Sequence, residues 1–87
     1  MKIADVSYFN RPVPWDALRA AGVTCVMVRG PIGAAGADWD FAVNWVQAKT
    51  FPRHGIYGDV VRTESAAAQS DNFLAVCNGD YGTEALV

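Results

Sequence analysis

The sequence predicts an α/β fold in which helices pack against a parallel sheet of three to four strands. Strand-like and helix-like segments alternate along the 87 residues in the order βαβαβα(β), and this alternation is typical of parallel sheets built with right-handed crossovers. The run VTCVMV at residues 23–28 is apolar at nearly every position, as is usual for a strand that is covered on both faces. We therefore expect a single domain over residues 1–87, with 23–28 as its second strand.

The first half of the chain is divided by prolines and glycines. The first strand is expected at residues 3–9 and a short helix at 14–21, with Gly22 ending this helix. The segment 30–38, GPIGAAGAD, predicts a mobile loop, because its glycine spacing without a following Lys-Ser or Lys-Thr matches neither nucleotide-binding fingerprint. Asp38 closes this segment and is expected to cap the next helix.

The second half of the chain repeats the alternation. A helix is expected at residues 39–50, where apolar side chains recur at helical spacing, and a strand follows at 54–61. Thr63 or Ser65 is expected to cap a third helix. Residues 83–87 then begin a fourth strand. The order of these elements gives no sign of a second domain.

Composition and charge exclude several classes of function. The chain is 52% hydrophobic and 18% charged with a net charge of −2, and no apolar run approaches the ~20 residues that span a bilayer. The Lys and Arg residues are scattered, so no basic stripe is available to neutralise nucleic-acid phosphates. The N-terminus lacks the apolar core of a signal peptide, which predicts a cytoplasmic protein.

The sequence also lacks a pattern for a metal or a cofactor. His54 is the single histidine, so no second imidazole can share a metal with it. Cys25 and Cys77 have no CxxC partner and are expected to be buried, reduced thiols. We expect neither a metal nor a cofactor.

The candidate site residues follow from the predicted topology. Functional groups in parallel α/β folds gather where the strands end, at their carboxyl ends. This rule selects Asp5, Arg29, Tyr57 and Asp59, flanked by Tyr8 and the segment 30–38. An alternative interpretation is that Asp5 and Arg29 form a structural ion pair that closes the edge of the sheet.

Several motifs, in a fixed order, carry a resemblance to a known family. They are the DVSYF opening, the helix WDALRAAG with the strand after it, the segments DFAVNWVQAK and GIY, and the helix AAAQSDNFLAV. Together they resemble the N-terminal half of glycoside hydrolase family 25, the lysozymes of bacteria and phages that cleave the sugar backbone of peptidoglycan. The resemblance runs from Ile3 to Val87 and implies a partial, TIM-like (β/α) barrel, here a truncated half-barrel.

The resemblance also assigns site residues. It implies that Asp5 is the active-site aspartate of the first strand, retained as a vestigial catalytic residue, in a pocket that also contains Ser7, Tyr8, Arg29, Tyr57 and Asp59. The family usually has a histidine after the pocket tyrosine, where this sequence has Gly58. The family's Asp-x-Glu pair on strand four would begin about where this sequence ends. Because glycoside hydrolysis needs two carboxylates, Asp5 alone cannot supply both.

These points lead to two alternative functions. The first is a non-catalytic, lysozyme-like interaction module of phage or prophage origin. It would pair with itself as a homodimer or bind a host protein, with weak binding of peptidoglycan and none of nucleic acid or membranes. The alternative is a peptidoglycan muramidase or a fragment of one. The expected interface residues are the aromatic side chains Trp39, Phe41 and Tyr81.

Overall fold

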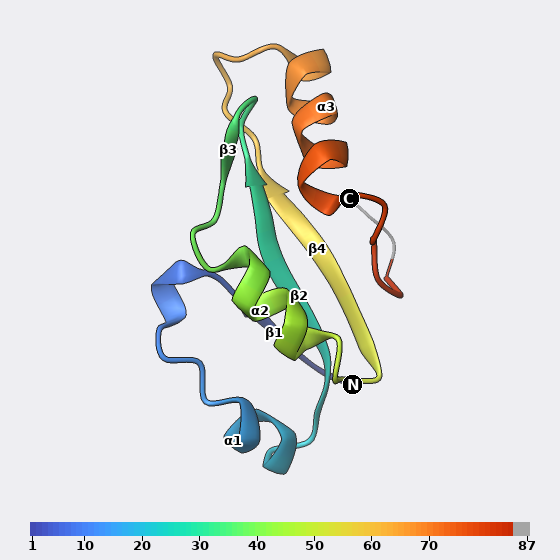
Figure 1. Ribbon diagram of the computed structural model, residues 1–87. Coiled ribbons are helices and arrows are strands. Elements are labelled where there is room, and N and C mark those ends of the chain that lie inside the picture. The colour runs from blue at the N-terminus through green and yellow to red at the C-terminus, as the bar shows by residue number, and fades with distance from the viewer. Residues whose placement is uncertain (85–87) are drawn as a thin grey trace.

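The computed structural model describes residues 1–84, and their elements alternate largely as expected (Figure 1). The strands are β1 (Lys2–Val6), β2 (Val23–Ile32), β3 (Gly36–Ala37) and β4 (Arg53–Asp59). The α-helices are α1 (Trp15–Ala20), α2 (Phe41–Ala48) and α3 (Ala66–Cys77), and a 3₁₀ helix covers Tyr8–Asn10. None of the helices in residues 1–84 is long and apolar enough to cross a membrane.

The strand β2 lies at the centre of the sheet. It pairs in parallel with β1 on one side and with β4 on the other, and its C-terminal end pairs antiparallel with β3. The four-stranded sheet is therefore mixed, whereas the sequence predicted a purely parallel one. Over residues 1–84 the sheet is open and does not close into a barrel.

The segment 30–38 accounts for the antiparallel strand, and its prediction as a mobile loop was wrong. β2 continues through Gly30 and Pro31, both buried, and the chain then turns back into β3. Gly33, with φ +60, provides the left-handed turn residue, and its N–H donates to the Asp59 carbonyl at 2.9 Å. The glycines therefore form a hairpin that packs on the rest of the fold.

The hydrophobic core lies between one face of the sheet and the helices. In Figure 1, α2 lies in front of the sheet, α1 lies below the lower end of the sheet, and α3 lies beside β4. The register brings Val6, Val28 and Ile56 side by side on this face. Val28 and Ile56 are fully buried, and full burial of such a side chain contributes roughly 1.5–3 kcal/mol. The core consists of Val6, Val26, Val28, Trp45, Ala48, Phe51, Ile56 and Cys77.

The opposite face of the sheet is not covered by a helix within residues 1–84. The register places Asp5 beside Met27 and Arg29 beside Tyr57 on this face. Ile3, also on this face, is 62% exposed. We call these five residues the open face.

The ends of the elements are set by local capping. β1 stops at Val6, short of the predicted 3–9, because the Ser7 hydroxyl accepts the Phe9 N–H and starts the 3₁₀ helix. Ser65 caps α3 by accepting the Ala68 N–H at 3.2 Å, which confirms one of the two predicted caps. Asn78, in the left-handed conformation, ends α3.

The expected fourth strand can be followed only at its first residues. The N–H groups of Thr83 and Glu84 both donate to the His54 carbonyl at the edge of β4, but neither residue is in a strand. Residues 85–87 of this prediction lie outside the described residues. Cys25 and Cys77 are free and buried, as predicted, and burial raises the pKa of both thiols.

Candidate functional site

Arg29, within β2, connects Asp59 at the end of β4 to Asp38, which follows β3. Its Nε and Nη2 donate to Asp38 Oδ2 at 2.9 and 2.8 Å, and its Nη1 donates to Asp59 Oδ2 at 2.9 Å. Burial lowers the pKa of Arg29, but the hydrogen bonds that Arg29 donates to Asp38 and Asp59 outweigh this effect, and the pKa is raised. A permanent cation therefore lies between two carboxylates at this edge of the sheet.

Asp38 is the buried partner of this cation. Its side chain is fully buried, whereas that of Asp59 is about half exposed. The Tyr8 N–H donates to both carboxylate oxygens, at 2.9 and 3.1 Å, and the Asp40 N–H donates to Oδ1 at 2.8 Å. Asp38 was expected to cap the helix at 39–50, but the N-cap residue of α2 is Asp40. Asp38 instead connects the end of β1 to the segment before α2.

An exposed group of aromatic side chains lies next to this charged cluster. We call Tyr8, Phe9 and Trp39 the aromatic rim. Trp39 is 82% exposed and Phe9 is 77% exposed. The Tyr8 ring contacts both in edge-to-face geometry, with centroids 5.1 Å from Trp39 and 5.7 Å from Phe9. Large aromatic groups this exposed are typical of binding surfaces.

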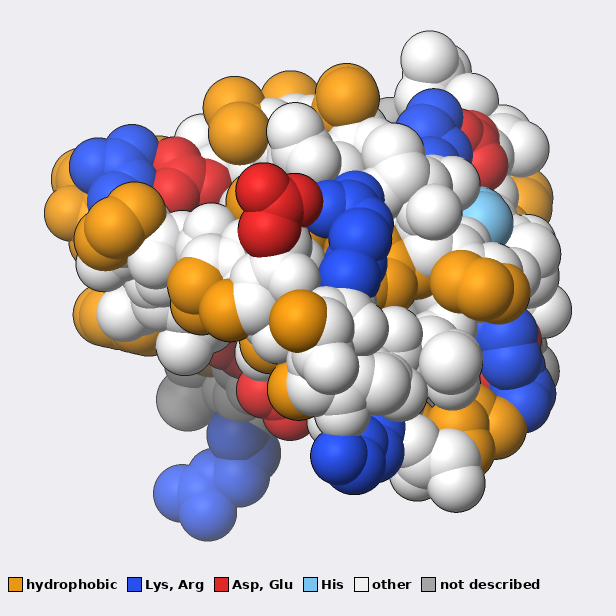
Figure 2. All heavy atoms as spheres, turned by 90° about the horizontal axis from the view of Figure 1, so that it is seen from below, with side chains coloured by type: hydrophobic (Ala, Val, Ile, Leu, Met, Phe, Trp, Pro, Cys, Tyr) orange, Lys and Arg blue, Asp and Glu red, His pale blue; other side chains and the backbone are white. Residues whose placement is uncertain are grey.

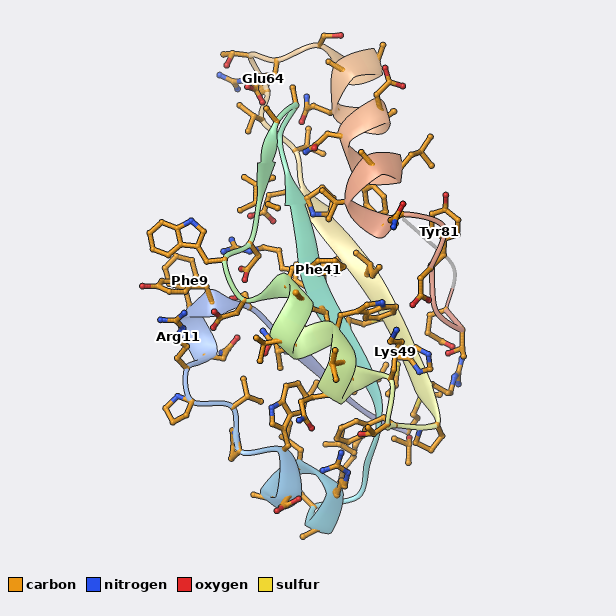
Figure 3. All side chains as sticks on the ribbon, viewed as in Figure 1. Phe9, Arg11, Phe41, Lys49, Glu64 and Tyr81 are labelled. Atoms are coloured by element: carbon orange, nitrogen blue, oxygen red, sulfur yellow. The ribbon has the colours of Figure 1, made fainter. Side chains whose placement is uncertain are left out.

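Arg11 supports the aromatic rim from the side. Its guanidinium lies 4.5 Å from the centroid of the Tyr8 ring, and Nε and Nη2 each donate to Asp40 at 2.6 Å. Hydrogen bonding to Arg11 lowers the pKa of the Asp40 carboxyl. Figure 3 shows Phe9 and Arg11 on the same side of the molecule, at the 3₁₀ helix.

A cavity of about 240 Å³ connects the aromatic rim to the charged cluster. The aromatic residues and Arg29 both contribute to its wall, so it offers apolar and charged contacts. It is lined by Tyr8, Phe9, Arg29, Ile32, Ala37, Asp38 and Trp39.

Asp5 and Tyr57 lie on the open face beside this cluster. Burial and then the charge of Asp5 raise the pKa of the Tyr57 phenol. The alternative ion pair between Asp5 and Arg29 is not formed, because Arg29 binds Asp38 and Asp59 instead. Within residues 1–84, Asp5 makes no side-chain hydrogen bond, and it is exposed.

The remaining predicted residues do not gather at one place. Ser7 is buried and bonded to Asn10, so it supports the 3₁₀ helix. Phe41 is partly buried and stacks on Trp45 in the core. Tyr81 follows α3, and Figure 3 places it on the side of the molecule opposite Phe9. Of the three predicted interface residues, Trp39 alone belongs to the aromatic rim.

The sequence placed Asp38 beside the site only as the last residue of the flanking segment 30–38, and it did not indicate Phe9 as a member of the site. Asp38 had the signal of an ordinary helix cap, an aspartate ahead of an amphipathic segment. Phe9 was assigned to a strand. β1 ends at Val6, so Phe9 belongs to the 3₁₀ helix and its side chain is exposed. The motif Ser7-x-x-Asn10, which caps this helix, was the sequence signal that could have predicted the end of the strand.

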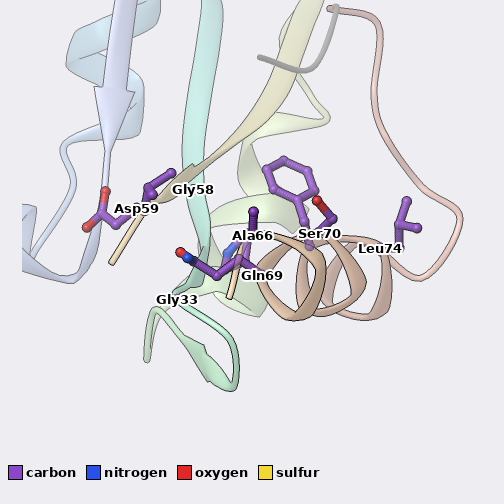
Figure 4. A pocket seen from close by; sticks show the side chains of 10 residues that line it. Gly33, Gly58, Asp59, Ala66, Gln69, Ser70 and Leu74 are labelled. Carbon is purple, nitrogen blue, oxygen red and sulfur yellow. The ribbon is translucent and has the colours of Figure 1, made fainter. Parts of the chain in front are cut away.

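A second cavity, of about 480 Å³, lies between the end of β4 and α3 (Figure 4). A Cβ atom at Gly58 would lie 2.8 Å from Pro31 Cγ and 3.3 Å from the Phe73 ring, so a larger side chain has no room there. Asp59 lines this cavity while its carboxylate binds Arg29. The cavity is lined by Pro31, Gly33, Gly58, Asp59, Val60, Ala66, Gln69, Ser70, Phe73 and Leu74.

The charged side chains on the lower face of the molecule are mostly paired. Figure 2 shows most Lys and Arg side chains of that face beside Asp or Glu side chains, with small hydrophobic groups between them. The ion pairs of the described residues include Arg19 with Asp16 and Lys49 with Asp80. Basic charge is therefore not gathered on the face seen in Figure 2.

The order of the elements defines a β/α protein. Its candidate site, formed by the aromatic rim, Arg29, Asp38 and Asp59, lies toward the carboxyl ends of the parallel strands β1 and β4. The chain is similar in structure to a family 25 glycosyl hydrolase from Bacillus anthracis, with a TM-score of 0.76 and 20% sequence identity. The similarity covers 92% of this chain and 35% of the hydrolase, so this chain spans about a third of that protein. No family model matches the sequence. No curated protein matches it either. The comparison supports a lysozyme-like fold.

Proposed function

We propose that this chain binds a polysaccharide of the peptidoglycan type at the edge formed by the aromatic rim, Arg29 and Asp5. The observation that carries the proposal is the position of the exposed aromatic rim beside a cluster of fixed charges at the carboxyl edge of a lysozyme-like sheet. Sugar rings have apolar faces that pack on aromatic side chains and hydroxyl groups that bind carboxylates and guanidinium groups.

Asp5 is the carboxylate of this edge that is available to a ligand. Arg29 binds both Asp38 and Asp59, whereas Asp5 is exposed on the open face and makes no side-chain hydrogen bond within residues 1–84. Hydrolysis of a glycosidic bond requires a second carboxylate on the other side of the bond. The described residues therefore support binding, and cleavage would need a further acid from elsewhere.

The experiment is co-sedimentation with insoluble peptidoglycan, carried out with the wild-type chain and three variants. Trp39→Ala and Asp5→Asn should weaken binding about tenfold, equivalent to about 1.4 kcal/mol. Tyr81→Ala is the matched control, because it removes an exposed aromatic side chain away from the rim. Absence of wild-type binding, or equal losses in Trp39→Ala and Tyr81→Ala, would contradict the proposal. Clearing of the suspension would add cleavage to the proposed activity.

A second candidate function, protein interaction, is favoured by the open face. Ile3 is 62% exposed there, and β1 has an unpaired edge within residues 1–84. Exposed apolar surface and free strand edges are typical of surfaces that associate with another copy or another protein. Light scattering tests self-association. A dimer should have twice the chain mass of 9.3 kDa, and a single species of chain mass at high concentration would contradict it.

A further inference from the structure

We propose that Asp38 is a positioning residue that holds the aromatic rim in its ligand-binding arrangement. The inference rests on the proposed binding of polysaccharide at this edge. Asp38 itself is fully buried, so it acts through Tyr8 and Trp39 and does not touch the ligand.

The contacts of Asp38 connect two segments that are thirty residues apart in the chain. Both of its oxygens accept the Tyr8 N–H, and Oδ1 also accepts the Asp40 N–H. Trp39 lies between Asp38 and Asp40, so both of its neighbours in the chain are held by the same carboxylate. One side chain thereby fixes Tyr8 relative to Trp39, whose ring centroids are 5.1 Å apart.

Arg29 supplies the charge that keeps this carboxylate stable in a buried position. Two of its nitrogens donate to Asp38 Oδ2, at 2.9 and 2.8 Å. A buried carboxylate without such a partner would be strongly destabilising. The Arg29 guanidinium and the N–H groups of Tyr8 and Asp40 together donate to both carboxylate oxygens of Asp38. The side chain at position 38 must therefore provide two acceptor atoms.

An asparagine at position 38 could not reproduce these contacts. Its amide has one acceptor oxygen, and its NH₂ group is a donor. In either orientation, the NH₂ group would face the Arg29 guanidinium or the N–H groups of Tyr8 and Asp40. The Asp38→Asn substitution therefore breaks one side of the connection while it preserves the size of the side chain.

The other connection between the two segments is weaker. Arg11 binds Asp40 and covers the Tyr8 ring, but its side chain is 58% exposed. Water screens this pair on the Arg11 side, whereas the Asp38 side chain is fully buried. Asp38 is thus the principal connection between the two segments, and its loss should loosen the rim even when Arg11 is present.

The test compares Asp38→Asn with Asp71→Asn, a matched loss of a carboxylate on the exposed surface of α3. The first readout needs no ligand and is amide hydrogen exchange at Tyr8 and Asp40, measured by NMR. Asp38→Asn should accelerate both by more than tenfold, and Asp71→Asn should change neither. The second readout is co-sedimentation with insoluble peptidoglycan, where Asp38→Asn should lose about tenfold in affinity.

The outcomes separate this inference from the proposed function. Wild-type binding with equal binding by Asp38→Asn overturns the positioning role and leaves the proposed function standing. Absence of wild-type binding overturns the proposed function, while the exchange rates still test whether Asp38 orders the rim. If Asp38→Asn does not fold, amide hydrogen exchange in the wild-type chain provides the test. Slow exchange of the Tyr8 amide supports the connection between Tyr8 and Asp38, and exchange at the rate of an unfolded chain overturns it.

Discussion

Asp5 and Tyr57 lie on the same face of the sheet, on the two strands that flank β2, and burial followed by the Asp5 charge raises the pKa of the Tyr57 phenol. A neighbouring negative charge opposes the formation of phenolate. This relationship places the exposed carboxylate of the candidate site within electrostatic reach of Tyr57.

We predict that Asp5→Asn lowers the pKa of Tyr57 toward its ordinary value. The phenol keeps its proton more strongly in the folded chain, so its contribution to stability is fully present below the unfolded value of 10.0 and is lost as the pH rises through the higher folded-state pKa. Ultraviolet titration of wild type, Asp5→Asn and Tyr57→Phe would assign the Tyr57 signal. An identical Tyr57 midpoint in wild type and Asp5→Asn would refute the proximity of the two groups.

We predict that Gly58→Ala destabilises the fold by about 1–3 kcal/mol. The added Cβ atom would meet Pro31 Cγ at 2.8 Å and the Pro31 carbonyl oxygen at 3.1 Å, and the backbone cannot retreat without disturbing β2. Urea unfolding measures the change. Ala75→Ser, on the exposed surface of α3, is the control and should stay within about 0.5 kcal/mol of wild type. Equal stability of Gly58→Ala and wild type would contradict the tight packing.

We predict that Ser65→Ala lowers the free energy of unfolding by about 1 kcal/mol, because it removes the side-chain acceptor at the start of α3. Ser70→Ala changes the same residue type in the middle of the same helix, where no cap is lost. Because alanine is the better helix former there, this control should be neutral or slightly stabilising. Similar losses in both variants would argue against the capping role of Ser65.

We predict that Asp80→Asn weakens the acid dependence of stability. The hydrogen bond from Lys49 lowers the pKa of the Asp80 carboxyl; burial opposes this effect, and the Trp45 indole N–H adds to it. A carboxyl with a lowered folded-state pKa stabilises the fold above its unfolded value of 3.8, and this contribution is lost as the pH falls through the folded value.

The free energy of unfolding of wild type should therefore decrease more steeply below about pH 4 than that of Asp80→Asn. Asp71→Asn should follow the wild-type curve, since Asp71 is exposed on α3. The Trp45 indole N–H resonance reports the same contact, because it donates to Asp80 at 3.1 Å. If the free energy of unfolding has the same pH dependence in wild type and Asp80→Asn, the ion pair between Lys49 and Asp80 does not contribute to the acid dependence of stability.

Local sequence patterns were sufficient for most of the elements. The apolar run at 23–28 lies within β2, and the predicted cap Ser65 begins α3. These features depend on residues a few positions apart, so a single sequence can reveal them. The lysozyme-like fold implied by the motifs also agrees with the structural comparison.

The features that could not be predicted depend on distant residues. The hairpin at 30–38 is held by Glu64, which accepts the Ala34 N–H, and by Asn72, which donates to the carbonyls of Gly33 and Gly36. No local pattern links these residues, so the glycines suggested a loop. The role of Asp38 was hidden for the same reason, because Tyr8 precedes it by thirty positions.

The central position of β2 has a consequence for how the molecule opens. Within residues 1–84, β1, β3 and β4 each pair with β2 and none pairs with another of the three. Each outer strand can therefore detach without disturbing the ladders of the other two. Release of one outer strand should therefore expose the β2 amides that donate to that strand, and the two sides of β2 should exchange with solvent in separate events of lower energy than unfolding of the whole chain.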